Sequence, residues 1–157
     1  MRRTLILMLG AALAGVGLAA GAAALASGSQ GLTHPTRIKV VERAVTDQVI
    51  DIGAPGDSPG DLLPFANPIY DATNTNRIGR DQGSCVRASA SQGRWECMYT
   101  TLLPQGHLTV EGPFLDAQTT TRLSVTGGTG AYANARGVLV LHLRPDGNFD
   151  FDFHLLP

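Results

Sequence analysis

The stretch RIGRDQGSCVRASASQGRWECMYTTLL, residues 77–103, contains two β-prone runs separated by small and polar residues at positions 90–93. Such a break between two extended runs is typical of a β-hairpin. Folding the chain about Ser91 places Cys85 opposite Cys97, and directly opposed residues share one face of an antiparallel sheet. The stretch therefore predicts two paired strands with both cysteines on the same face.

Similar short β-prone runs recur between turn residues along the rest of the chain, with almost no helical pattern. The runs cover residues 37–45, 47–52, 62–70, 77–88, 94–103, 107–114, 119–125, 137–144 and 148–155. This spacing is typical of an all-β sandwich or barrel. The 157 residues accommodate one compact domain, which we place at residues 37–157.

The last run alternates with a period of two, as a strand between an apolar and a polar environment requires. One face consists of Phe149, Phe151, Phe153 and Leu155, and the other of Asn148, Asp150, Asp152 and His154. With an apolar barrel interior, the Asp and His side chains face solvent. With a polar cavity inside, Asp150 and Asp152 become candidate acid–base groups.

The N-terminal segment has the three parts of a secretory signal peptide. Met1-Arg2-Arg3 precedes an uncharged stretch rich in Leu, Ala and Gly, and Ala24-Leu25-Ala26 forms an A-x-A cleavage pattern. We interpret residues 1–26 as a signal peptide and residues 27–36 as a flexible lead-in. The mature protein is then secreted or extracytoplasmic. The alternative is an uncleaved membrane anchor, the only membrane association that the sequence suggests.

Export decides how the two cysteines are interpreted. Outside the cytoplasm two cysteines form a disulfide by default, and they are too few for a structural zinc site unless distant histidines join them. We therefore predict a Cys85–Cys97 disulfide. Two free thiols, or one reactive thiol, remain the alternative.

Composition and motifs argue against several classes of function. A net charge of −1 provides no basic surface for nucleic acid. Residues 128–133 fit the letters of G-x-G-x-x-G/A, but no helix or βαβ unit surrounds them. The four histidines, at positions 34, 107, 142 and 154, lack metal-ligand spacing, and G-x-S-x-G is absent. The sequence predicts no metal, no cofactor and no nucleic-acid partner.

Glu42 is an acidic residue within an otherwise β-prone run, where it shares a face with Val40 and opposes the face of Val41. In this position the carboxylate either faces solvent or lines a cavity with a shifted pKa.

Several separated motifs in the same order resemble those of the plant allene oxide cyclases. They lie at residues 60–71 (GDLLPFANPIYD), 77–79, 83–86, 106–114 (GHLTVEGPF) and 125–130 (VTGGTG). The chain is also similar to the dirigent proteins, whose G-R-x-Q-G and G-G-T-G-x-[FY]-x-x-A-R-G patterns correspond to residues 79–83 and 127–137. Together these similarities cover roughly residues 40–155, nearly the whole mature chain.

The resemblance implies an eight-stranded antiparallel β-barrel with a central apolar cavity, assembled as a homotrimer. In the cyclases the cavity steers ring closure of an unsaturated fatty-acid epoxide, and dirigent proteins steer the coupling of phenoxyl radicals. By matching position, Glu42 is implied as the catalytic carboxylate. The implied ligand-binding residues are Leu63, Phe65, Asn67, Cys85, Trp95 and Phe114.

Three functions follow as hypotheses. The first is an exported barrel that binds a small hydrophobic or aromatic molecule and steers its cyclisation, isomerisation or coupling. The second is a noncatalytic carrier of such molecules, favoured because Ala44 stands where the cyclases have Asn and a downstream Ser-Pro is missing. The third is a structural barrel whose interior is filled by its own side chains.

Overall fold

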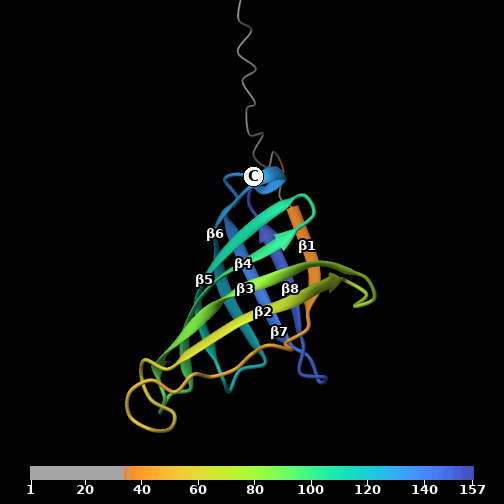
Figure 1. Ribbon diagram of the computed structural model, residues 1–157. Coiled ribbons are helices and arrows are strands. Elements are labelled where there is room, and N and C mark those ends of the chain that lie inside the picture. The colour runs from red at the N-terminus through yellow and green to blue at the C-terminus, as the bar shows by residue number, and fades with distance from the viewer. Residues whose placement is uncertain (1–33, 35) are drawn as a thin grey trace, which may run out of the picture.

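Eight of the nine β-prone runs form strands, and these close into one antiparallel barrel (Figure 1). The computed structural model describes His34 and residues 36–157, so the predicted signal peptide and most of the predicted lead-in lie outside the described residues. The strands are β1 (Thr36–Glu42), β2 (Leu62–Asp71), β3 (Arg77–Ser89), β4 (Arg94–Leu103), β5 (Gly106–Leu115), β6 (Thr120–Gly128), β7 (Gly137–Leu143) and β8 (Phe149–Leu155).

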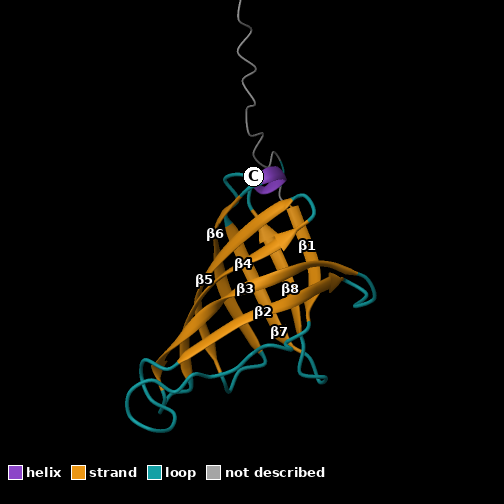
Figure 2. Cartoon of the chain, in the orientation of Figure 1, coloured by secondary structure: helices purple, strands orange, loops and turns teal. Residues whose placement is uncertain are grey.

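Each strand pairs with the next one along the chain, and β8 pairs with β1 to complete the closure. Loops connect the strands, and the only helix among the described residues is the short η1 (Gly130–Tyr132) (Figure 2). No helix in this part of the chain is long and apolar enough to cross a membrane. The prediction of an eight-stranded antiparallel barrel is confirmed.

The run at residues 47–52 is not a strand, and this part of the sequence interpretation is wrong. It lies in the long connection between β1 and β2, where an isolated bridge between Ile50 and Leu62 is the only β-pairing. Just before it, the backbone N–H groups of Val45 and Thr46 donate to the side-chain Oδ1 of Asn67. A side chain thus takes the hydrogen bonds that a neighbouring strand would otherwise accept.

The hairpin of β3 and β4 has the predicted register, with Cys85 directly opposite Cys97. A disulfide joins the two residues, and neither cysteine is free. The alternative of free thiols is therefore wrong. Both residues are buried, so the bridge belongs to the inner face of the barrel wall.

The disulfide is expected to stabilise the barrel. It joins positions 12 residues apart, and closing a loop of this length lowers the free energy of the folded relative to the unfolded state by about 2–3 kcal/mol. The Cys85→Ala/Cys97→Ala variant is expected to lose that much, measured by urea unfolding. Reductant should destabilise the wild type and leave the double variant unchanged. A double variant as stable as the oxidised wild type would contradict this assignment.

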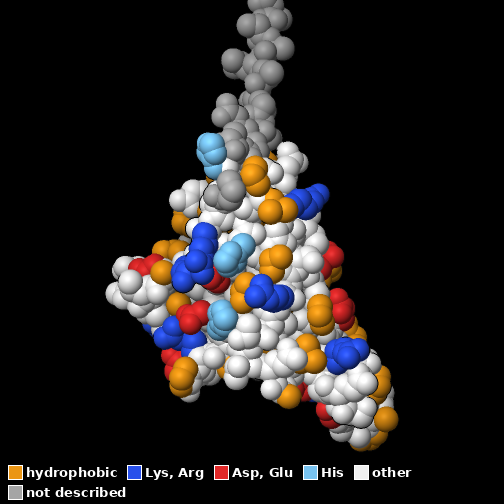
Figure 3. Space-filling view, turned by 180° about the vertical axis from the view of Figure 1, so that it is seen from behind, with side chains coloured by type: hydrophobic (Ala, Val, Ile, Leu, Met, Phe, Trp, Pro, Cys, Tyr) orange, Lys and Arg blue, Asp and Glu red, His pale blue; other side chains and the backbone are white. Residues whose placement is uncertain are grey.

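The two faces of β8 separate as the alternation predicts. Phe151 and Phe153 are buried inside. Asp152 and Asp150 are on the opposite face and form ion pairs with Arg37 and Arg144. Acidic, basic and histidine side chains lie interspersed on the side of the barrel seen in Figure 3. The interpretation with an apolar interior is confirmed, and neither Asp150 nor Asp152 lines the inside of the barrel.

The interior is tightly filled at the end of the barrel where η1 and the C-terminus lie (Figure 1). Phe153 and Leu139 are register partners on β8 and β7, and both side chains have no solvent exposure, as does Leu108 on β5. Contacts of this kind give the fold most of its stability. Packing is looser towards the other end, and the candidate site lies there.

Candidate functional site

A cavity of about 120 Å³ lies inside the barrel, beside the ends of β1 and β2 that flank their long connection. Its outer part is formed by half-buried apolar side chains, Leu63, Phe65, Phe114 and Phe149. Its volume approaches the roughly 150 Å³ of a protein cavity known to hold benzene. The barrel is therefore not completely filled by its own side chains, and the cavity is large enough for a ligand group of about one aromatic ring.

The structure brings together most of the predicted site residues. Glu42, Leu63, Phe65, Cys85 and Phe114 all line the cavity. The Cys85–Cys97 disulfide forms part of the inner wall together with Leu123, Leu141 and Phe151. Asn67 and Trp95 are buried but lie outside the lining.

Asn67 positions the polar end of the cavity. It lies two residues beyond Phe65 on the same face of β2, and its side chain has no solvent exposure. Its Nδ2 donates to Glu42 Oε1 at 2.8 Å and to Asp47 Oδ1 at 2.5 Å. Because its Oδ1 accepts the N–H groups of the β1–β2 connection, one amide fixes both carboxylates and the chain between them.

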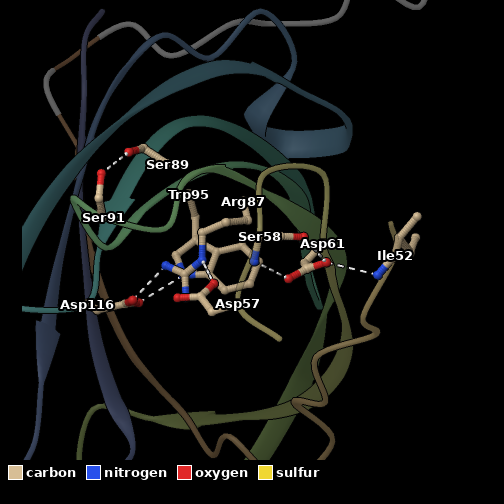
Figure 4. A network of polar contacts seen from close by, with 9 residues as sticks. All are labelled: Ile52, Asp57, Ser58, Asp61, Arg87, Ser89, Ser91, Trp95 and Asp116. Atoms are coloured by element: carbon tan, nitrogen blue, oxygen red, sulfur yellow. Dashed lines mark hydrogen bonds and ion pairs between the residues drawn. The ribbon is translucent and has the colours of Figure 1, made fainter. Parts of the chain in front are cut away.

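Trp95 stacks against Arg87 near the end of the hairpin (Figure 4). The Arg87 guanidinium lies 3.8 Å from the ring centroid, and Trp95 Nε1 donates to Asp116 Oδ1 at 2.8 Å. Arg87 also forms ion pairs with Asp57 at 2.7 Å and Asp116 at 2.6 Å. Since Asp57 belongs to the β1–β2 connection, this network attaches the connection to β3 and β4 and holds the indole away from the cavity.

Sequence reasoning missed three polar residues of the lining, namely Asp47, Asp81 and Tyr99. Asp81 and Tyr99 could have been found by counting in twos from Cys85 and Cys97, because alternate residues of a strand share a face. Asp47 gives no such signal, since it lies in a connection of irregular structure.

Glu42 and Asp81 are buried in the lining without a counter-cation, whereas Asp47 is exposed. No Lys, Arg or His lines the cavity among the described residues, and none of the described acidic, His or Cys side chains forms a group of three or more that could hold a metal ion. Burial raises the pKa of Glu42 to about 7, against the opposing hydrogen bond from Asn67 and with a further increase from the charge of Asp47. The pKa of Glu42 thus suits proton transfer near neutral pH.

The pKa values of two other groups in the lining, Asp81 and Tyr99, are also raised. Burial, followed by the nearby charge of Glu42, raises the pKa of Asp81 well above its ordinary value. Burial also raises the pKa of Tyr99, and the charges of Asp81 and Glu42 add to the effect. Both groups therefore favour their neutral, protonated forms.

The raised pKa of Glu42 is expected to make the fold more stable in mild acid than at neutral pH. Between the ordinary value of 4.5 and the folded value of about 7, the native state binds more protons than the unfolded chain. The free energy of unfolding therefore decreases as the pH rises through this window, by on the order of 3 kcal/mol from this group.

Urea unfolding at a series of pH values tests this expectation. The Glu42→Gln variant should show a smaller decrease than the wild type, because glutamine does not titrate. Glu111→Gln, on an exposed position of β5, is the matched control and should retain the wild-type slope. An unchanged slope in Glu42→Gln would contradict the assignment.

Comparison with known proteins agrees with this geometry. A family model described as allene oxide cyclase matches residues 40–144, which include six of the eight strands completely, β2 to β7, and the last three residues of β1. The chain belongs to the allene oxide cyclase family. The resemblance inferred from the sequence motifs is therefore confirmed.

The family fold recurs in several solved structures. A pyocyanin demethylase is 21% identical, with a TM-score of 0.69 over 77% of this chain and 100% of the demethylase chain. A pterocarpan synthase dirigent protein is 16% identical, with a TM-score of 0.61 over 78% and 94%. An exo-specific intermolecular Diels-Alderase is 13% identical, with a TM-score of 0.59 over 77% and 97%. At these identities the likeness establishes the barrel fold.

Proposed function

We propose that this allene oxide cyclase-like barrel binds a small hydrophobic or aromatic molecule in its cavity and steers its cyclisation, isomerisation or coupling. The observation that carries the proposal is Glu42, a buried carboxylate with a pKa of about 7 that lines an otherwise largely apolar cavity. Such a pocket fixes the conformation of a reactive molecule, excludes water and offers one group for proton transfer.

The similar structures support this proposal by the reactions in their names, which are a demethylation, a pterocarpan synthesis and a Diels–Alder cycloaddition. Each name denotes the transformation of a small organic molecule. The cavity of this chain, with Phe65, Phe114 and Phe149 around its outer part, provides aromatic surface for such a ligand.

A noncatalytic carrier is the second candidate. It is favoured by Ala44, which replaces the Asn that the cyclase pattern has two residues after the glutamate. A carrier would bind the same molecules saturably but would change neither their rate of conversion nor the stereochemistry of the product.

Export and homotrimer assembly belong to the same proposal. The signal-peptide pattern at residues 1–26 and the buried disulfide support export. Exposed apolar side chains on the β1–β2 connection, Val45, Val49, Ile50 and Ile52, support burial of this segment in an assembly.

Native mass spectrometry of the mature protein, purified from the compartment to which its own signal directs it, tests these points together. We expect a chain that begins at Ser27, a trimeric mass and a co-purifying small molecule of hydrophobic or aromatic character. A monomeric mass would contradict the assembly, and an N-terminus at Met1 would contradict cleavage. Failure of the recovered molecule, or of a panel of small aromatic molecules, to bind saturably would contradict the ligand-binding function.

A further inference from the structure

Two buried polar atoms at the inner end of the cavity have no hydrogen-bond partner among the described residues. They are Oδ2 of Asp81 and the hydroxyl oxygen of Tyr99. Asp81 has no solvent exposure and Tyr99 is 6% exposed, yet both side chains line the cavity. A buried polar group without a hydrogen-bond partner is destabilising, so a ligand atom that accepted hydrogen bonds from both groups would bind more tightly than an apolar atom in the same place.

The two groups are close neighbours in the sheet. Asp81 on β3 is paired directly with Thr101 on β4, and Tyr99 precedes Thr101 by two residues on the same face. Asp81 and Tyr99 are therefore diagonal neighbours across the hairpin. Their polar ends can act on the same ligand atom.

The position of each group is fixed by its surroundings. Thr101 Oγ1 donates to Asp81 Oδ1 at 2.8 Å, which leaves Oδ2 as the free oxygen. The Tyr99 ring contacts Phe65 and Phe151 with centroid separations of 5.6 and 6.1 Å. Gly83 lies opposite Tyr99, and even a Cβ atom at position 83 would overlap the tyrosine backbone and Cβ. The hydroxyl is thus held in place before any ligand arrives.

Both groups act as hydrogen-bond donors. Burial and the neighbouring acids raise the pKa of the Asp81 carboxyl and of the Tyr99 hydroxyl, which favours the protonated form of each group. Since Oδ1 of Asp81 already accepts from Thr101 and Oδ2 has no partner among the described residues, the protonated acid offers its proton from Oδ2. A carboxylic acid kept neutral in an apolar site can donate to a ligand oxygen and to the negative charge that develops on it.

We infer that Asp81 and Tyr99 together bind the carbonyl oxygen of a small aromatic or unsaturated ketone, while Glu42 exchanges a proton with the carbon beside that carbonyl. This inference rests on the proposed function and names its substrate class. A neutral ketone fits a cavity that has no Lys, Arg or His in its lining. It also accepts the two hydrogen bonds that the unpartnered groups can donate.

The proton-transfer step needs no oxidant or reductant. The Glu42 carboxylate takes a proton from the carbon beside the carbonyl, and the electron pair of that C–H bond forms a carbon–carbon double bond. The carbonyl π electrons move to the oxygen, and Asp81 and Tyr99 stabilise the resulting enolate. Return of the proton from Glu42 to the same carbon gives exchange, and its return to a conjugated carbon gives an isomer.

A set of indane probes tests the binding part of the inference. The ketone 2-indanone places a carbonyl on a flat ring system, and 2-methylideneindane replaces its oxygen with a CH₂ group. We expect the ketone to bind about tenfold more tightly than the alkene, as one or two hydrogen bonds would give. We also expect the infrared carbonyl stretch of the bound ketone to lie at lower frequency than that of the same ketone in an apolar solvent.

Variants assign this preference to the two donors. Tyr99→Phe removes a hydroxyl that has no partner within the described part of the chain, so the fold should be unaffected. It should lower ketone affinity about tenfold, reduce the infrared shift and leave alkene affinity unchanged. Asp81→Leu removes the second donor and should likewise lower ketone affinity, reduce the infrared shift and leave alkene affinity unchanged. Cooperative urea unfolding of this variant shows that it is folded. Tyr132→Phe, whose hydroxyl donates to Gln105 Oε1 away from the cavity, is the control and should retain the wild-type values.

The role of Glu42 is tested with the same ketone in D₂O, by the rate at which NMR detects exchange of the hydrogens beside the carbonyl. The wild type should accelerate exchange. Tyr99→Phe should slow exchange, and Glu42→Gln should abolish the acceleration while the infrared shift persists. No acceleration by the wild type, or equal acceleration by Glu42→Gln, would overturn the assignment of Glu42.

The outcomes separate the inference from the proposed function. Equal affinity for ketone and alkene without an infrared shift would overturn the inference, while binding of a small aromatic molecule would still stand. Tighter binding of protonated isoindoline, which carries a cation at the carbonyl position, would also overturn it and would identify the acids as a cation site. Failure of all three probes to bind would count against the proposed aromatic-binding function itself.

Discussion

Glu42→Gln is expected to reduce the rate of any proton transfer that the protein catalyses by a factor of about 10²–10⁴, the range that general acid–base catalysis contributes. Glutamine is close to glutamate in size and keeps an oxygen that can accept from Asn67 Nδ2, the donor 2.8 Å from Glu42 Oε1. The polar end of the cavity should therefore remain intact. Ligand affinity should change by much less than the rate, and the measurement is the exchange rate or the conversion of the co-purified molecule.

The pH profile distinguishes a base from a merely polar group. Glu42 has a pKa of about 7 because it is buried, so a rate that requires its carboxylate rises with pH through that region and then levels off. Glu111→Gln changes an equivalent side chain on an exposed position of β5 and should retain the profile. A wild-type rate that does not vary with pH, together with an active Glu42→Gln, would leave Glu42 without a catalytic role.

The barrel was predictable because its signals are local. The alternation of Phe149, Phe151 and Phe153 with acidic residues defines an inner and an outer face from the sequence alone, and the structure has the same faces. The Cys85–Cys97 pair fixes the register of β3 against β4. With that register known, the inward direction of every second residue on both strands follows.

The chemical character of the cavity was not predictable in the same way. Strand alternation places Asp81 and Tyr99 on the inner face, but whether their polar atoms find partners depends on distances between separate strands. Trp95 illustrates the same limit. Its position on the inner face agrees with strand alternation. The indole nevertheless contacts Arg87 and Asp116 and does not line the cavity.

The strand predicted at residues 47–52 is absent from the structure, again because of contacts between segments that are distant in the sequence. The run has β-prone residues, but strand propensity depends strongly on its neighbours. Here the Asn67 side chain accepts the N–H groups of Val45 and Thr46, and the connection passes over the end of the barrel. The same local departure brings Asp47 to the cavity, so the missed site residue and the missed irregular segment share one explanation.

Phe153→Ala is expected to lower the free energy of unfolding by about 3–5 kcal/mol, the range for removing a large aromatic side chain from a well-packed core. Phe153 has no solvent exposure and contacts the neighbouring ring of Phe151 edge-on, with centroids 6.0 Å apart. It does not line the cavity. The loss therefore measures packing in the filled half of the barrel and is obtained from urea unfolding, with thermal unfolding as a second measurement.

Phe149→Ala is the matched comparison, because it removes the same side chain from the same face of the same strand. Phe149 is half-buried, lines the cavity and meets Phe114 edge-on with centroids 6.1 Å apart. Part of its surface is already in contact with solvent, so its removal should cost less than half as much stability and should instead weaken ligand binding. Equal losses of stability for the two variants would contradict the division of the barrel into a filled half and a ligand-binding half. If Phe153→Ala impaired ligand affinity as strongly as Phe149→Ala, the bound molecule would have to reach deeper than the present cavity.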